Sequence, residues 1–345
     1  MKTNIAAFFP GQGSQYVGMG KSLFDNFTVA KETYEEASDA IKLDLKKLCF
    51  DSAESELRLT MNTQPALLVT SVASFRVAKE ETGFSPDAVL GHSLGEYSAL
   101  VAAGSIELST AAKWVRARGI AMQEAVPFGQ GTMAAIMGLD DQTLEILCAD
   151  ASETAKLRRT KGENTDIHVE AIVEPANYNS PGQTVISGST DAVTEAIALI
   201  KSDDKFKGAK AILLDVSAPF HSRLMKNAKE KMKELFASAS QADLPKTLDF
   251  PYLPNRTARP TREAGIVIEM LTDQIDKAVL WRQSISRLLL TDFIAGIEFG
   301  PGKVLQGISK RIAQNEKKDF FLYGCNDVDS VKGFNGFLSK GFIGT

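Results

Sequence analysis

Short apolar runs alternate with longer amphipathic stretches along most of this chain. The apolar runs predict buried strands, and they lie at residues 5–9, 87–90, 132–138, 169–173, 184–187, 211–216, 250–253 and 297–299. The amphipathic stretches predict helices at residues 24–48, 63–78, 96–103, 110–125, 140–149, 191–201, 227–237, 264–274, 281–290 and 304–314. Strands and helices that alternate in this way are typical of an α/β fold.

The pattern changes in the middle of the chain, after a glycine-rich hinge at residues 129–131. Residues 130–216 predict a small α+β unit, with a split β-α-β arrangement, inserted into a larger α/β layer. That layer would consist of residues 1–129 and 217–345. Residues 151–170 are polar and charged, and we expect them to form a surface loop of the small unit. The tail after Asp327 shows little periodicity and is expected to be a mobile end.

Composition narrows the class of protein. The chain has 345 residues, of which 44% are hydrophobic and 24% are charged, as in ordinary globular proteins. Its net charge of −4 argues against binding to nucleic acid through bulk charge. The three cysteines lie far apart, which indicates a reducing compartment and no metal knuckle. The N-terminus reads as a strand rather than a signal peptide, and no apolar run is long enough to span a membrane, so we expect a cytoplasmic protein.

The strongest chemical signal is Gly-His-Ser-Leu-Gly at residues 91–95, between a predicted strand and a predicted helix. A Gly-x-Ser-x-Gly turn in this context lifts the serine hydroxyl out of the backbone at the positive end of the helix. Ser93 is therefore the candidate nucleophile, and the N–H of Leu94 would point to a developing oxyanion. The alternative is a plain turn, since serine between glycines also occurs there.

A second glycine-rich loop, Gly-Gln-Gly-Ser-Gln at residues 11–15, follows the first predicted strand. Its backbone could approach a ligand, or it could be an ordinary turn. The loop lacks the Gly-Lys-Ser/Thr of a phosphate-binding loop.

The chain has three histidines that could serve as a base. His92 lies inside the elbow and should point away from Ser93, and His168 lies in the charged stretch, where it is expected to be solvated. His221 follows a predicted strand and comes after the nucleophile, as in α/β hydrolases. It could take the Ser93 proton and return it to a leaving thiol, or be a loop histidine without a task. Its orienting partner could be Asp215 or a backbone carbonyl.

Several segments in the same order resemble the malonyl-CoA:acyl carrier protein transacylase family. They are residues 9–15, 91–96, 118–119, 177–183 and 300–305, and the likeness extends from about residue 4 to about residue 313. The resemblance implies an α/β-hydrolase-like large subdomain with an inserted small ferredoxin-like subdomain. It also implies transfer of a malonyl group from malonyl-CoA to the thiol of an acyl carrier protein, without a metal or redox cofactor.

The resemblance assigns roles by motif. Ser93 resembles the acylated nucleophile and His221 the base of a dyad, and the position of Gln274 supplies a backbone carbonyl that orients the histidine. The backbone N–H groups of Gln12 and Leu94 resemble the oxyanion hole. Arg118 resembles the clamp for the malonyl carboxylate.

Physical chemistry supports the role of Arg118. Malonyl differs from acetyl by one carboxylate, and a guanidinium offers paired donors to a carboxylate. Without the resemblance, Arg118 would be interpreted as a surface arginine. Phe220, directly before His221, is common in malonyl-selective polyketide acyltransferases, where its ring would crowd an α-methyl group. Many bacterial fatty-acid enzymes of the family have a small residue at this position, so Phe220 leaves two pathways open: fatty-acid supply is the main interpretation, and a malonyltransferase of a polyketide pathway is the alternative.

Other functions on the same scaffold are a hydrolase, which would need water at the acyl-serine, and a non-catalytic carrier-binding protein, which would lack Ser93 or His221. Carrier proteins of this family are acidic, whereas this chain is itself net negative. Docking therefore requires a local basic patch, for which the candidates are Lys303, Lys310 and Arg311, and then Lys113 and Arg116.

Overall fold

A computed structural model describes residues 4–216 and 218–339 of the chain. The chain divides into two compact units. The first unit comprises Met1–Ile120, Leu235–Met270 and Ser284–Thr345, and the second comprises Ala121–Glu234 and Leu271–Gln283. Residue 217, where we expect the large layer to resume, lies outside the described residues.

The first unit contains a parallel sheet of four strands in the order β2-β1-β7-β8. These strands are β1 (Asn4–Phe9), β2 (Ala88–Gly91), β7 (Phe293–Phe299) and β8 (Phe321–Cys325). The side chains at residues 6–9 of β1 are fully buried, as expected for a central strand covered on both faces. Because the strands are parallel, their carboxyl ends meet at one edge of the sheet. The loop that carries Gln12 and the elbow at Ser93 both begin at this edge.

The helices of the first unit confirm most of the predicted positions. They include α1 (Lys21–Asn26), α2 (Thr28–Ile41), α3 (Leu45–Phe50), α4 (Glu54–Leu57), α5 (Thr60–Thr82), α6 (Gly95–Ala102), α13 (Val304–Asn315) and all but the last turn of α7 (Leu108–Gln123). The single helix predicted at residues 24–48 is wrong. The chain breaks at Phe27, which is extended, and at Lys42, whose left-handed backbone ends α2.

The prediction of a mobile end after Asp327 is also wrong for the described residues. Helix α14 (Val328–Ser339) follows β8. Phe334 is fully buried, and its ring packs against those of Phe84 and Tyr323, with centroids 5.1 and 5.6 Å apart. Aromatic packing fixes this helix although its glycines blur the helical period.

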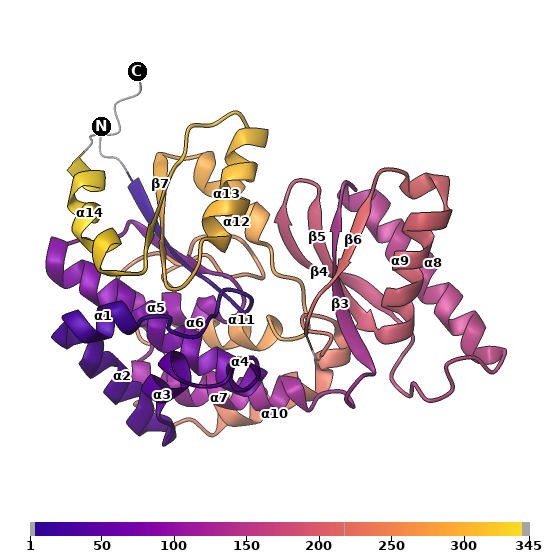
Figure 1. The fold of residues 1–345 in the computed structure, drawn as a ribbon, viewed down its shortest axis with the longest axis horizontal. Helices are drawn as coiled ribbons and strands as arrows, with labels where there is room; N and C mark the ends of the chain where they lie inside the picture. The colour runs from indigo at the N-terminus through magenta and orange to yellow at the C-terminus, as the bar shows by residue number, and fades with distance from the viewer. Residues whose placement is uncertain (1–3, 217, 340–345) are drawn as a thin grey trace. The chain divides into compact units, whose positions relative to one another are not determined.

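The second unit contains an antiparallel sheet with the order β4-β5-β3-β6, with α8 and α9 on one face (Figure 1). Its elements are β3 (Gly131–Met137), α8 (Asp141–Thr160), β4 (Val173–Ser180), β5 (Gln183–Ser189), α9 (Thr190–Ser202) and β6 (Lys210–Leu213). Apolar side chains from both helices and from the sheet form one core, which includes Ile136, Leu147, Ile186 and Val193.

Three predictions for this unit need correction. Residues 151–160 form the last turns of α8 rather than a loop, and Arg158 and Arg159 pair with Glu195 and Asp191 of α9. Arg159 makes a bidentate bond to Asp191, at 2.7 and 2.8 Å. The strand predicted at residues 169–173 begins only at Val173, and the one predicted at 211–216 ends at Leu213.

Helices α10 (Lys226–Ala237), α11 (Val267–Asp273) and α12 (Trp281–Leu289) complete the described helices. The strand predicted at residues 250–253 is reduced to isolated bridges at Tyr252, one of them a parallel bridge to Val89. Within residues 4–216 and 218–339, no helix is both long enough and apolar enough to cross a bilayer.

Candidate active site

The elbow around Ser93 contains two glycines, Gly91 and Gly95, at positions that have no room for any side chain. A Cβ atom on Gly91 would lie 1.9 Å from the carbonyl of Gly95, and one on Gly95 would lie 2.0 Å from the carbonyl oxygen of Phe9. Between them Ser93 has a left-handed backbone with φ of 52°, an uncommon conformation for a residue with a side chain. The predicted strand-turn-helix context is confirmed by β2 and α6.

Arg118 lies beside the nucleophile in the first unit. Its Nη2 donates to Ser93 Oγ at 3.1 Å, and its Nη1 donates to Gln64 Oε1 at 2.8 Å. The side chain is only 1% exposed, and its guanidinium lies 5.8 Å from the ring centre of Tyr97. Burial lowers the pKa of Arg118, while the charges of Tyr97 and Glu96 act in the opposite direction. The interpretation of Arg118 as a surface residue is therefore wrong.

The loop that carries Gln12 lies against the elbow. The N–H of His92 donates to Phe9 O at 3.0 Å, and a Cβ atom on Gly11 would lie 2.5 Å from the carbonyl oxygen of His92. Leu94 is the N-cap residue of α6. The sheet edge thus brings together the Gln12 loop, Ser93 and Leu94, and Arg118 reaches Ser93 from α7.

His221 and Gln274 meet in the second unit. His221 Nδ1 lies 2.7 Å from the carbonyl oxygen of Gln274, and both residues are buried. Because a carbonyl only accepts, Nδ1 carries the hydrogen and Nε2 is the basic nitrogen. Of the two orienting partners that the sequence leaves open, the carbonyl is the one in contact with Nδ1. Asp215 lies beyond the end of β6 rather than within it.

Hydrogen bonds fix both the loop that carries His221 and the segment that carries Gln274. His221 has a left-handed backbone with φ of 59°. After it, the N–H and Nε of Arg223 both donate to the carboxylate of Glu174, at 2.8 and 3.0 Å. On the Gln274 side, Lys229 Nζ donates to Asp273 at 2.7 Å and to Asp276 at 3.1 Å. Burial lowers the pKa of Lys229, but these two bonds outweigh it and the pKa is raised.

The remaining candidates lie on the surface or have other tasks. His168, Lys113, Lys303, Lys310 and Arg311 are exposed, as expected. Arg116 Nη1 donates to Met61 O at 2.7 Å and also bonds to Asn62. Met61 is four residues before Pro65, which lies inside α5 and has no N–H for that carbonyl. Arg116 therefore stabilises α5, which makes it a weaker candidate for docking.

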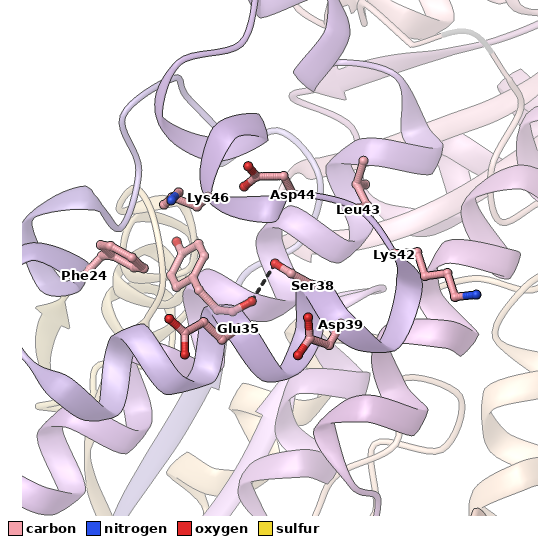
Figure 2. A pocket seen from close by; sticks show the side chains of 9 residues that line it. Phe24, Glu35, Ser38, Asp39, Lys42, Leu43, Asp44 and Lys46 are labelled. Atoms are coloured by element: carbon pink, nitrogen blue, oxygen red, sulfur yellow. Dashed lines mark hydrogen bonds between the residues drawn. The ribbon is translucent and has the colours of Figure 1, made fainter.

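A surface pocket of about 400 Å³ lies at the turn between α2 and α3 in the first unit. Figure 2 shows that its labelled side chains carry charges of both signs, and the bond drawn inside it joins Ser38 Oγ to the carbonyl oxygen of Tyr34. None of the predicted site residues lines this pocket. Across residues 4–216 and 218–339 no cluster of three or more His, Cys, Asp or Glu side chains is arranged to hold a metal ion.

Sequence reasoning missed Gln64, Glu96 and Asn255. Gln64 holds the Arg118 guanidinium, Asn255 bonds to Gly91 and Ser93 of the elbow, and Glu96 in α6 accepts from Asn255 N. Glu96 directly follows the elbow motif, and a fully buried carboxylate there could have been suspected. Asn255 is 162 residues from Ser93, so local pattern gives no signal for it.

Comparisons with known proteins agree with this geometry. A family model for the acyl transferase domain matches residues 8–332. The malonyl CoA-acyl carrier protein transacylase of Bacillus subtilis strain 168 is 42% identical over 316 residues, which cover 91% of this chain and 92% of that protein.

Solved structures show the same likeness. An acyl-carrier-protein S-malonyltransferase from Burkholderia pseudomallei 1710b is 39% identical with a TM-score of 0.85, over 96% of this chain and 99% of that one. A malonyl-transacylase in complex with its type II polyketide synthase acyl-carrier protein is 36% identical with a TM-score of 0.86, over 97% of this chain and 100% of that one. The chain therefore belongs to the acyl transferase domain family and, within it, to the malonyl CoA-acyl carrier protein transacylases.

Proposed function

We propose that this chain transfers a malonyl group from malonyl-CoA to the phosphopantetheine thiol of an acyl carrier protein and so supplies fatty-acid synthesis. The observation that carries the malonyl assignment is the buried Arg118 guanidinium, which donates to Ser93 Oγ at 3.1 Å. A buried cation beside a nucleophile favours an acyl group that carries its own carboxylate, because the carboxylate compensates the charge that burial destabilises.

The first half-reaction forms the acyl-enzyme. Ser93 Oγ attacks the thioester carbonyl of malonyl-CoA while His221 Nε2 takes its proton. The backbone N–H groups of Gln12 and Leu94 stabilise the tetrahedral oxyanion. The C–S bond then breaks, and the histidine returns the proton to the departing CoA thiolate. The contact of Nδ1 with Gln274 O supports this role, because it leaves the basic nitrogen at Nε2.

The second half-reaction runs the same steps in reverse order with a different thiol. The carrier's phosphopantetheine thiol gives its proton to His221 and attacks the malonyl ester, and Ser93 leaves with that proton. Each half-reaction exchanges a thioester with an oxyester, so the proposed chemistry needs no metal or redox cofactor.

Arg118 would select the acyl group. Gln64 Oε1 holds Nη1, while Nη2 points at the nucleophile and can donate to a malonyl carboxylate. A substrate without that carboxylate would leave a buried cation without its partner, which is costly.

We also infer the finer description of the two units. The order β3-α8-β4-β5-α9-β6, with the sheet order β4-β5-β3-β6, supports a ferredoxin-like subdomain inserted at residues 130–216. The strand-elbow-helix of residues 88–102 supports an α/β-hydrolase-like subdomain made of residues 1–129 and 217–345. Three buried cysteines without disulfides fit a reducing, cytoplasmic compartment.

A polyketide pathway remains the second candidate. Phe220 precedes the histidine and is 7% exposed, and one structural relative is the transacylase of a polyketide carrier. Comparing kcat/KM for fatty-acid and polyketide carrier proteins decides between the two pathways.

Intact-mass spectrometry tests the proposed function directly. Malonyl-CoA should add one malonyl group to the wild-type chain, and that adduct should persist without a carrier and disappear when a holo-carrier is added. Ser93→Ala should show no adduct and no transfer. An adduct on Ser93→Ala would contradict the nucleophile, and rapid loss of the adduct to water would favour a hydrolase.

A further inference from the structure

We propose that Asn255 is a positioning residue for the nucleophile: its side-chain amide fixes the two peptides that lead into Ser93. The role of Ser93 as nucleophile rests on the proposed function, whereas the contacts of Asn255 do not.

Asn255 reaches the elbow because the segment before it, residues 251–253, lies beside β2. Val89 N donates to Pro251 O at 2.9 Å, and Leu253 N donates to Val89 O at 3.1 Å. The bridge between Val89 and Tyr252 is parallel. Because the direction is parallel, the residues after Leu253 emerge at the carboxyl end of β2, where the elbow begins.

The Asn255 amide then bonds to the two peptides that flank His92, directly before Ser93. Ser93 N donates to Asn255 Oδ1 at 2.7 Å, and Asn255 Nδ2 donates to Gly91 O at 2.6 Å. A backbone N–H can only donate and a carbonyl can only accept, so these partners allow a single orientation of the amide. The side chain is 2% exposed, which shields both bonds from water.

The backbone of Asn255 is held in turn by the elbow helix. Asn255 N donates to Oε2 of Glu96, which is fully buried in the first turn of α6. The elbow therefore has a closed frame that joins Gly91, Ser93, Asn255 and Glu96. A left-handed backbone at a non-glycine residue persists only where its surroundings enforce it.

This frame matters for catalysis because it sets two directions at once. Fixing the peptide before Ser93 fixes where Oγ points, and the next peptide carries the Leu94 N–H of the proposed oxyanion hole. The bonds between Arg118 and Gln64 do not involve the frame. Loss of the frame should therefore slow the chemical step and leave recognition of the malonyl carboxylate intact.

Rapid-quench measurement of malonyl-Ser93 formation separates these effects. Asn255→Ala should lower the maximal acylation rate by roughly 10²-fold, the scale of a misplaced reacting group, with half-saturation by malonyl-CoA changed less than about twofold. Asn255→Asp keeps an acceptor for Ser93 N but cannot donate to Gly91 O, and should lose roughly tenfold. The frame would then be shown to act through both bonds.

Ser105→Ala is the matched control. Ser105 Oγ donates to Lys246 O at 3.0 Å and so tethers the beginning of the same segment away from the elbow. This variant should lose a side-chain bond to the segment but keep the wild-type acylation rate. An equal loss in Ser105→Ala and Asn255→Ala would overturn the proposal, because general loosening of the segment would then explain both.

Labelling of Ser93 by a fluorophosphonate separates this proposal from the proposed function, because the probe carries no malonyl group. The same ranking of variants is expected for its maximal labelling rate. If malonyl-CoA fails to acylate the wild-type chain, the proposed function fails while the labelling still tests Asn255. Wild-type labelling by Asn255→Asp, or a loss confined to half-saturation, would overturn the proposal. Should Asn255→Ala not fold, the comparison of Asn255→Asp with wild type decides.

Discussion

The nucleophile elbow and the histidine loop both hold a non-glycine residue in a left-handed backbone conformation, but different contacts hold it in each. Ser93 and His221 both adopt left-handed backbones, with φ of 52° and 59°, although neither is glycine. In the elbow, backbone atoms touch where Gly91 and Gly95 lack side chains, and the Asn255 amide closes the turn. In the histidine loop, hydrogen bonds and ion pairs hold the flanks and the ring.

The two regions should therefore fail in different ways. Packed backbone has no room for even one methyl group, so the elbow should respond steeply to added volume. The side chain of Arg223 in the histidine loop is 57% exposed, and exposed ion pairs contribute little each. That loop should respond gradually, as its bonds are removed one at a time.

The largest effect is expected from Gly95→Ala. The new Cβ would lie 2.0 Å from Phe9 O, which is backbone and cannot turn aside. We expect loss of acylation by more than about 10²-fold from misplacement of Ser93, together with a lower melting temperature. Gly307→Ala is the control: a Cβ there meets nothing within 4 Å in α13, and should stabilise the chain by about 0.5–1 kcal/mol. Wild-type acylation by Gly95→Ala would show that the elbow tolerates volume.

The second effect comes from removing the base. His221→Ala should slow acylation by roughly 10²-fold or more, the usual contribution of a general base. The measurement is rapid-quench acylation of both proteins under the same conditions. Acylation by His221→Ala at the wild-type rate would assign the base elsewhere.

The third effect is a change of selectivity rather than a loss. Arg118→Ala should abolish most malonyl transfer but keep or increase acetyl transfer, because no buried cation remains to be compensated. Gln64→Ala should weaken malonyl selectivity less, since it loosens only Nη1. The ratio of kcat/KM for malonyl-CoA and acetyl-CoA measures both. Equal losses for the two substrates would mean that Arg118 is not the clamp.

The fourth effect tests the gradual failure of the histidine loop. Lys229→Met removes the ammonium that bridges Asp273 and Asp276 on either side of Gln274. We expect acylation to slow by roughly tenfold or less, because the ring keeps its carbonyl partner but the carbonyl is held less firmly. Lys233→Met, whose ion pair with Glu230 is exposed, should act like wild type. A loss of acylation rate as large as that of His221→Ala would show that the histidine loop, like the elbow, loses function when a single contact is changed.

The sequence predicts best what short segments determine. The elbow and its glycines follow from residues 91–95 alone, and the apolar runs predict strands at the positions of β1, β2 and β7. The fourth strand of the parallel sheet, β8, was missed. Residues whose partners lie far away in the sequence have no local pattern that predicts their contacts. Asn255 reaches Ser93 only because the chain runs beside β2, and Gln64 meets Arg118 only through the packing of α5 and α7.

The errors in the predicted elements have the same origin. The charged end of α8 resembles a loop until Arg159 is seen to pair with Asp191. The glycine-containing tail resembles a mobile end until Phe334 is seen among other rings. In both cases, partners distant in sequence stabilise a helix whose local pattern is weak.

The smallest effect concerns a surface that neither region contains. Lys303, Lys310 and Arg311 are exposed at or along α13, whereas Arg116 is engaged with α5. If an acidic carrier docks on this face, replacing Lys310 and Arg311 by glutamate should slow malonyl transfer to the carrier through the association rate, and only at low salt. Acylation by malonyl-CoA should be unchanged, because that half-reaction needs no carrier. Glutamates at Lys46 and Lys47, exposed on α3, change the net charge equally and serve as the control. If both double variants slow transfer alike, net charge rather than α13 governs the encounter. If neither does, Lys113 is the next residue to reverse.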